Sequence, residues 1–188
     1  MYRIYRPFIL VLLLLICLAL FAHTGRAQEP PIVFNEILVG NAATTLDTDY
    51  TNFSGWIELR NTTSKTINLS KYRLVSLPDG ATMPDTFIIK SRLNLPANGR
   101  LILWADEKNK GPHLPFKLDM DGGELSLFNP AANLVTSIVL GKQSPDVSYG
   151  RAPDNSDTWA YFDQPTPGAA NTTPAFATRT ITAAPQFS

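Results

Sequence analysis

The chain has 188 residues, with 16 basic residues, 16 acidic residues and a single cysteine, Cys17. This length suits one domain with tails rather than two domains, and a hydrophobic content of 44% can supply a real core. One cysteine excludes a disulfide framework. The balanced charge, without any run of three basic residues, argues against binding nucleic acid through phosphate contacts.

The N-terminal segment differs in kind from the rest of the chain. Arg3 and Arg6 precede an apolar run of 15 residues, 8–22, and the small residues Gly25 and Ala27 occupy the positions that a signal peptidase reads. A membrane anchor is the alternative, but spanning a bilayer takes about 20 apolar residues, and this run is shorter. The sequence therefore predicts a signal peptide cleaved after Ala27. The protein is expected to be secreted or held at the cell surface, with the periplasm as an alternative.

Cleavage would change the chemistry of the remaining chain. The segment carries three arginines and no acid, so the mature chain has 13 basic and 16 acidic residues, a net charge of about −3. Cys17 and His23 also leave, so no cysteine remains and His113 is the one histidine. We therefore expect stability to come from core packing and expect no nucleic-acid partner.

From Ile32 onward, short apolar or alternating runs are separated by Gly, Pro, Asn and Asp, without an amphipathic helix. Turn sequences such as Pro78-Asp79-Gly80 space the runs. Gly40 to Gly55 is expected to be an exposed loop. The pattern predicts an all-β sandwich of about nine short strands. These are residues 32–39, 55–61, 72–76, 86–90, 100–105, 124–128, 134–140, 147–150 and 158–163.

The composition shifts to Thr, Pro and Ala after Asn171. We therefore predict one β-domain over residues 28–171 and a linker or tail over residues 172–188. The final Pro185-Gln186-Phe187-Ser188 resembles the opening of chitobiase C-terminal-type domains. This resemblance suggests that the parent protein continues past Ser188.

Several landmarks in order make the chain from Ile32 to Asn171 resemble the lamin-tail domain family. They are Asn35-Glu36-Ile37, Trp56-Ile57-Glu58-Leu59 with Asn61, Leu69-Ser70-Lys71-Tyr72-Arg73-Leu74, and residues 99–106, 113–118, 123–128 and 146–151, followed by the Pro165-Thr166-Pro167-Gly168 ending. The resemblance implies an immunoglobulin-like sandwich. Such domains occur in nuclear lamins and in many secreted bacterial proteins, where some lie beside CotH-like kinases, nucleases and other hydrolases.

The resemblance implies a non-catalytic interaction or spacer module, with an unknown protein or a cell-surface polysaccharide as partner. One alternative is an accessory domain of a larger extracellular enzyme. Another is a carbohydrate-binding module, because exposed aromatic rings can stack on sugars. The available rings are Tyr50, Phe53, Tyr149, Trp159, Tyr161 and Phe162.

Two pairs of carboxylates have a spacing that could hold a cation such as calcium: Asp47 with Asp49, and Asp119 with Asp121. Calcium takes six or more oxygens, and neither pair has further acids beside it. Asp beside Gly is also ordinary turn chemistry, as at Gly122. We expect turns without a metal, and the sequence leaves the cation alternative open.

The sequence offers no catalytic constellation and implies no cofactor. His113 has no Gly-x-Ser-x-Gly elbow to accompany it, and phosphate loops and His/Cys clusters are missing from the sequence. We expect His113 to be structural, and Asn35, Glu36 and Glu58 to form hydrogen bonds at strand edges or across strands. Four glycosylation sequons begin at Asn52, Asn61, Asn68 and Asn171.

Overall fold

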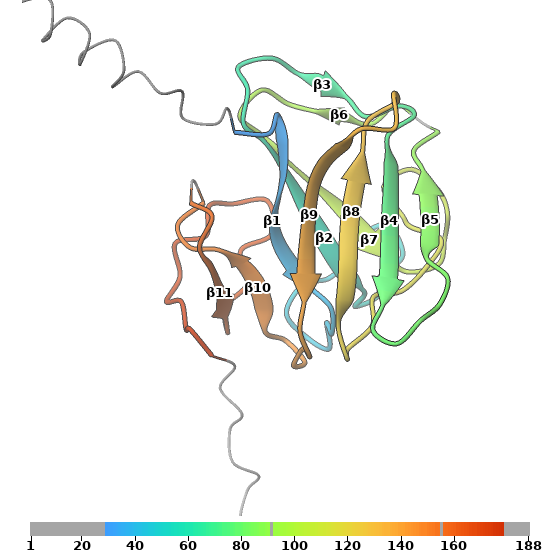
Figure 1. Ribbon diagram of the computed structural model, residues 1–188. Helices are drawn as coiled ribbons and strands as arrows, with labels where there is room; N and C mark the ends of the chain where they lie inside the picture. Colours follow the sequence, from blue (N-terminus) through green and yellow to red (C-terminus); the bar gives the residue numbers. More distant parts are fainter. Residues whose placement is uncertain (1–28, 91, 155, 179–188) are drawn as a thin grey trace, which may run out of the picture.

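The computed structural model describes residues 29–90, 92–154 and 156–178 (Figure 1). The predicted signal peptide and the last ten residues of the predicted tail lie outside these ranges. The strands within them are β1 (Ile32–Leu38), β2 (Gly55–Asn61), β3 (Ile67–Asn68), β4 (Arg73–Pro78), β5 (Asp85–Ile88), β6 (Asn94–Leu95), β7 (Arg100–Ala105), β8 (Gly123–Phe128), β9 (Leu134–Leu140), β10 (Ser148–Arg151) and β11 (Trp159–Phe162). No helix among the described residues is long and apolar enough to cross a membrane.

The strands form two main antiparallel sheets that face each other. One has five strands in the order β11-β10-β1-β2-β7, and the other has four in the order β5-β4-β8-β9. In Figure 1 the four-stranded sheet lies in front of β1, β2 and β7, while β10 and β11 extend to the left beyond its edge. A small β3-β6 sheet lies at the top. The arrangement confirms the predicted all-β sandwich.

All nine predicted strands are present, and three have the predicted bounds: β2, β7 and β9. The prediction missed β3 and β6, which have two residues each. A two-residue strand carries no alternation, so hydrophobic periodicity cannot reveal it.

The core lies between the sheets and is built from fully buried aliphatic and aromatic side chains such as Ile37, Ile57, Leu74 and Leu127. Full burial of each such side chain stabilises the fold by roughly 1.5–3 kcal/mol. The outer faces of the two central strands are also covered. Every residue of β1 is buried, and Trp56 at the start of β2 is as inaccessible as Ile57.

The loop between β1 and β2 is mostly exposed, as predicted for Gly40 to Gly55, but two of its polar residues are buried. Asn41 is 9% exposed and Asp47 only 1% exposed. Asn41 is buried because its side chain donates hydrogen bonds to the carbonyls of Thr45 and Ser54, which closes the loop on itself. The prediction did not anticipate these two buried residues, because Asn and Asp side chains can satisfy the polar groups of a loop internally.

Candidate functional site

Two groups of acidic side chains stand out among the described residues. The first is the buried carboxylate pair, Glu36 and Glu58, on the outer face of β1 and β2. The second is the loop cluster, Asp47, Asp49, Asp106 and His113, where the β1–β2 loop meets the chain after β7. The two groups differ in the hydrogen-bond partners of their carboxylate oxygens.

The buried carboxylate pair lies at one register position, with Glu36 of β1 opposite Glu58 of β2. Both side chains are inaccessible to solvent. Like charges directly opposite each other are normally destabilising in a sheet. The pair is held by donors from the C-terminal strap, residues 165–171, which crosses this face after β11.

The strap donates directly to both carboxylates. The backbone N–H and the hydroxyl of Thr166 donate to Glu36, at 3.2 and 3.0 Å, and Ser148 of β10 also donates to it. The backbone N–H of Gly168 donates to Glu58 at 2.6 Å, and the Asn35 amide donates to its other oxygen at 2.8 Å. The Pro-Thr-Pro-Gly ending is thus bound to the sheet through these two acids.

Burial raises the pKa of Glu36 and raises the pKa of Glu58 to about 7. The hydrogen bonds from Ser148 and Thr166, and those from Gly168 and Asn35, oppose this effect without cancelling it. Glu58 therefore takes up a proton near neutral pH, which relieves repulsion within the pair.

Asn171 and Asp154 complete the strap's attachment. The Asn171 amide donates to the backbone carbonyls of Asn35 and Arg151, and its N–H donates to Asp154 at 2.9 Å. Asp154 also forms an ion pair with Arg100, whose Nε lies 3.3 Å from Glu58. The predicted hydrogen bonds of Asn35, Glu36 and Glu58 are present. Many of their partners lie in the strap rather than on neighbouring strands.

Strand pairing brings the loop cluster together. Gly55 at the start of β2 lies opposite Ala105 at the end of β7, so the loops beyond these residues leave from the same edge. Asp106 follows β7 directly. His113 returns beside it because a short parallel bridge joins residues 112–114 to Trp104, with hydrogen bonds of 2.9 and 2.7 Å.

Three carboxylates surround the imidazole of His113. Its Nδ1 lies 2.8 Å from Asp106 Oδ2 and 3.8 Å from Asp47 Oδ2, and its Nε2 lies 3.2 Å from Asp49 Oδ2. The His113, Asp47 and Asp106 side chains are at most 3% exposed, whereas the Asp49 side chain is 66% exposed. The Tyr50 ring contacts the imidazole in a T-shaped arrangement, with the ring centroids 4.8 Å apart. The cluster is therefore buried except beside Asp49.

Asp47 uses only one of its two carboxylate oxygens in a hydrogen bond. Its Oδ1 accepts the N–H of Asp49 at 2.9 Å, while Oδ2 is buried and has no hydrogen-bond partner. One potential ligand atom from each of Asp47, Asp49 and His113 lies within 4.8 Å of the others. Carboxylate oxygens and an imidazole nitrogen are ligands that divalent transition metals accept.

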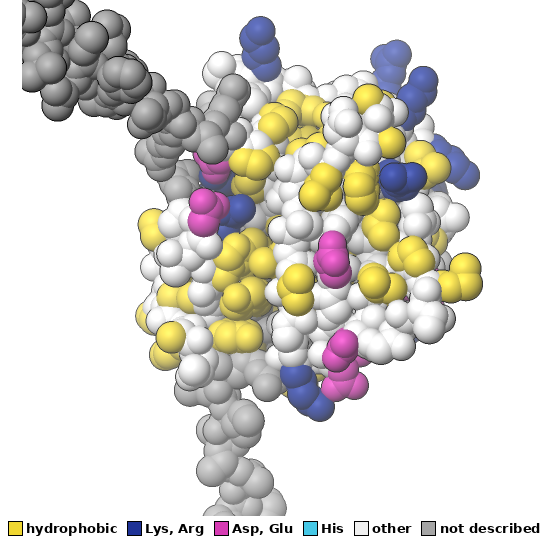
Figure 2. Space-filling view, in the orientation of Figure 1, with side chains coloured by type: hydrophobic (Ala, Val, Ile, Leu, Met, Phe, Trp, Pro, Cys, Tyr) yellow, Lys and Arg dark blue, Asp and Glu magenta, His cyan; other side chains and the backbone are white. Residues whose placement is uncertain are grey.

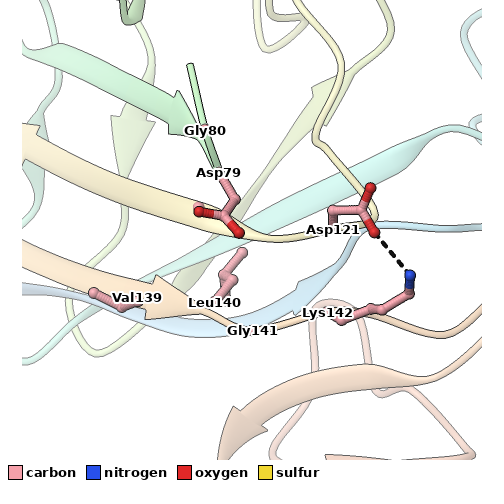
Figure 3. Close-up of a pocket in the computed structure, with 8 residues that line it drawn as sticks. Asp79, Gly80, Asp121, Val139, Leu140, Gly141 and Lys142 are labelled. Carbon is pink, nitrogen blue, oxygen red and sulfur yellow. Dashed lines mark ion pairs between the residues drawn. The ribbon is translucent and has the colours of Figure 1, made fainter. Parts of the chain in front are cut away.

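The other predicted carboxylate pair forms an exposed turn. Asp119 Oδ1 accepts the N–H of Asp121 at 2.8 Å, and Asp121 forms an ion pair of 2.9 Å with Lys142. Figure 3 shows Lys142 reaching across to Asp121, with Asp79 on a facing turn. The positive charge of Lys142 therefore already balances the negative charge of Asp121.

The prediction that His113 is structural did not anticipate its acidic surroundings, and it missed Asp106 altogether. Asp49 and His113 are 64 residues apart, so no local spacing connects them. Only the pairing of β2 with β7 brings their loops together. That pairing is a tertiary feature that a motif search does not contain.

The predicted sequons and aromatic residues fall in different surroundings. Asn61 is fully buried, and its amide donates to the carbonyls of Lys65, Leu95 and Pro96. Asn171 is buried in the strap, whereas Asn68 is exposed. Among the aromatic side chains, Tyr50 and Phe53 are exposed, Tyr149, Trp159 and Tyr161 are partly buried, and Phe162 is buried.

Two facing antiparallel sheets, with the last strands added to the edge of one of them, define an immunoglobulin-like β-sandwich. The lamin tail domain family matches residues 26–142, well over half of the chain, and the chain belongs to this family. The match confirms the resemblance seen in the sequence. It ends before β10, β11 and the strap. A comparison with curated proteins found no match.

Proposed function

We propose that this protein is an exported, non-catalytic interaction module that binds a partner protein through the outer face of the β5-β4-β8-β9 sheet. The family supports an interaction module built on an immunoglobulin-like fold. The observation that carries the proposal is the position of exposed aliphatic side chains on this face. Ile88, Leu134 and Val139 are 50%, 56% and 70% exposed.

The strand register arranges these side chains in rows. One row crosses all four strands from Ile88 through Arg73 and Phe128 to Leu134, and the Arg73 guanidinium lies 4.8 Å from the centroid of the Phe128 ring. Figure 2 looks onto this face and shows hydrophobic side chains over β9, β8 and β4, with few charges among them. Exposed apolar side chains gathered on one face of a sheet are a candidate interaction surface.

The chemistry of this face favours a protein over a polysaccharide. Aliphatic side chains with an interspersed arginine resemble the core of a protein interface, whereas sugars stack on exposed flat rings. The aromatic row of Tyr149, Trp159 and Tyr161 is partly buried, and its ring centroids are 4.7–5.1 Å apart, so the rings mainly cover one another.

Site-specific photo-crosslinking in the cells that produce the protein tests this function. A crosslinker at Val139 is expected to capture one defined protein, and a crosslinker at the exposed Lys65, outside this sheet, is not. The purified pair should then bind, and Ile88→Asp with Leu134→Asp should weaken binding at least tenfold. Equal capture from both positions, or hydrolase or kinase activity of the purified domain, would contradict the proposal.

Export is tested separately by mass spectrometry of the protein recovered from producing cells. The expected N-terminus is Gln28, because Gly25 and Ala27 precede it in the pattern of a cleavage site. An N-terminus at Met1 on the recovered protein would contradict export by this route.

The second candidate is an accessory domain of a larger extracellular enzyme. It is supported by the resemblance of Pro185-Gln186-Phe187-Ser188 to the start of another extracellular domain. Reading the coding DNA beyond Ser188 tests it: a catalytic domain in the same frame supports it, and an immediate stop codon refutes it.

A further inference from the structure

We propose that the loop cluster binds one divalent transition-metal ion, of the class of Zn²⁺, through Asp47, Asp49 and His113. Asp106 acts as the positioning residue for the imidazole. This site is independent of the proposed protein-binding face, because its residues lie in the β1–β2 loop and in the chain after β7.

The unpartnered oxygen of Asp47 is the first argument. Asp47 is 1% exposed, and its Oδ2 has no hydrogen-bond partner. Burying a carboxylate oxygen without a hydrogen-bond partner destabilises a fold. Asp47 offers one carboxylate oxygen to the group of atoms that lie within 4.8 Å of one another, and its Oδ2 lies 3.8 Å from His113 Nδ1, so an ion bound beside the imidazole would satisfy Oδ2.

The balance of charge is the second argument. Asp47, Asp49 and Asp106 bring three formal negative charges around one imidazole, which carries at most one positive charge. The Lys108 ammonium lies over the Tyr50 ring, 5.4 Å from its centroid, and forms no ion pair with the three carboxylates among the described contacts. A divalent cation would neutralise the excess inside the cluster.

The ligand types select the class of metal. An imidazole nitrogen with two carboxylate oxygens suits Zn²⁺ and its neighbours in the first transition row, which accept mixed N/O ligands and four-coordinate sites. Calcium prefers six to eight oxygens, which this cluster does not supply. The calcium alternative raised by the Asp47–Asp49 spacing is therefore less suitable than a transition metal that also uses His113.

Asp106 supports this geometry. Its contact of 2.8 Å with Nδ1 fixes the orientation of the ring and leaves Nε2 facing Asp49. A carboxylate on the far nitrogen is the usual second-shell partner of a metal-bound histidine. Because Asp49 is mostly exposed, an ion can enter from solvent and keep a water molecule as a further ligand.

A simple ion-pair cluster is the competing explanation. In that case a protonated His113 would hold the three carboxylates together without any metal. This explanation accounts for the contacts of Asp106 and Asp49, but it leaves Asp47 Oδ2 at 3.8 Å from the imidazole without a hydrogen bond. The two explanations give opposite results in a titration with metal.

The experiment is isothermal titration of the chelator-treated protein with Zn²⁺. We expect one ion per chain and a dissociation constant in the micromolar range or below. Asp49→Asn should weaken binding at least tenfold, and since this side chain is largely exposed, the variant should fold normally. His113→Gln should weaken binding further. The matched control is Asp121→Asn, which alters an acidic turn outside the cluster and should leave the affinity unchanged.

Nuclear magnetic resonance gives a second readout that does not depend on the variants. The sequence has only two histidines, and His23 lies in the predicted signal peptide, so the imidazole signals of His113 can be assigned directly. Zn²⁺ should shift the Nε2 resonance at one equivalent. The proposal is overturned if Zn²⁺ does not bind at one equivalent, if Asp121→Asn weakens binding as much as Asp49→Asn, or if the Nε2 resonance does not move.

Discussion

The buried carboxylate pair and the loop cluster both place acidic side chains inside a small sandwich, but they differ in how the carboxylate oxygens are hydrogen-bonded. Glu36 and Glu58 are surrounded by donors from the strap, and Glu58 takes up a proton near neutral pH. In the loop cluster, Asp47 keeps one buried oxygen without a partner, and Asp49 remains open to solvent. Buried acids that are fully satisfied indicate structure, whereas an incompletely satisfied cluster with an opening indicates a ligand.

The largest expected effect comes from removing the strap. A chain that ends at Asp163 loses four hydrogen bonds to β1 and β2: two from Thr166 and one each from Gly168 and Asn171. At about 1 kcal/mol for each lost hydrogen bond, its free energy of unfolding should fall by about 4 kcal/mol. The measurement is urea denaturation, with a chain ending at Asn171 as the control. Equal stability of the two chains would show that the strap is not part of the folded unit.

The pH dependence of stability tests the buried pair itself. The pKa of Glu58 rises from 4.5 to about 7 on folding, so the folded protein holds this proton more tightly than the unfolded chain does. Stability should therefore decrease as the pH rises from about 4.5 to 7, by up to about 3 kcal/mol from this group. The raised pKa of Glu36 acts in the same direction.

Glu58→Gln isolates this contribution, since glutamine is neutral at every pH. Urea denaturation between pH 5 and 8 should give the variant a shallower loss of stability than the parent protein. If both proteins show the same slope, Glu58 is ionised in the fold throughout this range, and the description of the pair is wrong.

A smaller effect is expected from Gly150→Ala. Gly150 lies opposite Glu36, and an added Cβ would approach the Asn171 amide nitrogen to 2.8 Å and Glu36 Cγ to 3.0 Å. The crowding should lower the free energy of unfolding by about 2 kcal/mol. Gly141→Ala is the matched control, because its Cβ would enter open space and should change stability by less than about 0.5 kcal/mol. The measurement is thermal denaturation of each variant. If both substitutions lower the melting temperature by similar amounts, the strap does not pack tightly against β10.

The sequence predicted the framework well because the framework depends on local alternation. The apolar residues of β2 and β9 alternate or cluster over seven residues each, and both strands were placed at their observed bounds. The Pro-Thr-Pro-Gly ending is the last landmark of the family resemblance and precedes the predicted end of the domain at residue 171. Its second role, binding the outer face through Glu36 and Glu58, depends on residues 110–130 positions away, which no local pattern encodes.

Only part of the candidate site could be predicted from the sequence, because local spacing reveals only residues that are close together in the chain. Asp47 and Asp49 stood out because they are two residues apart, but the third ligand, His113, arrives only through the pairing of β2 with β7. Asp119 and Asp121 have the same spacing, yet their turn is exposed and Asp121 pairs with Lys142. Spacing alone did not distinguish these pairs, whereas burial and the third residue do.

The contrast between the two acidic groups is tested most directly by the Zn²⁺ affinity of two variants measured side by side. Glu58→Gln alters the buried pair, and Asp49→Asn alters the loop cluster. We predict that Glu58→Gln leaves the affinity unchanged and that Asp49→Asn lowers it at least tenfold. An unchanged affinity in Asp49→Asn, or a loss of equal size in Glu58→Gln, would contradict the assignment of a closed structural pair and an open metal site.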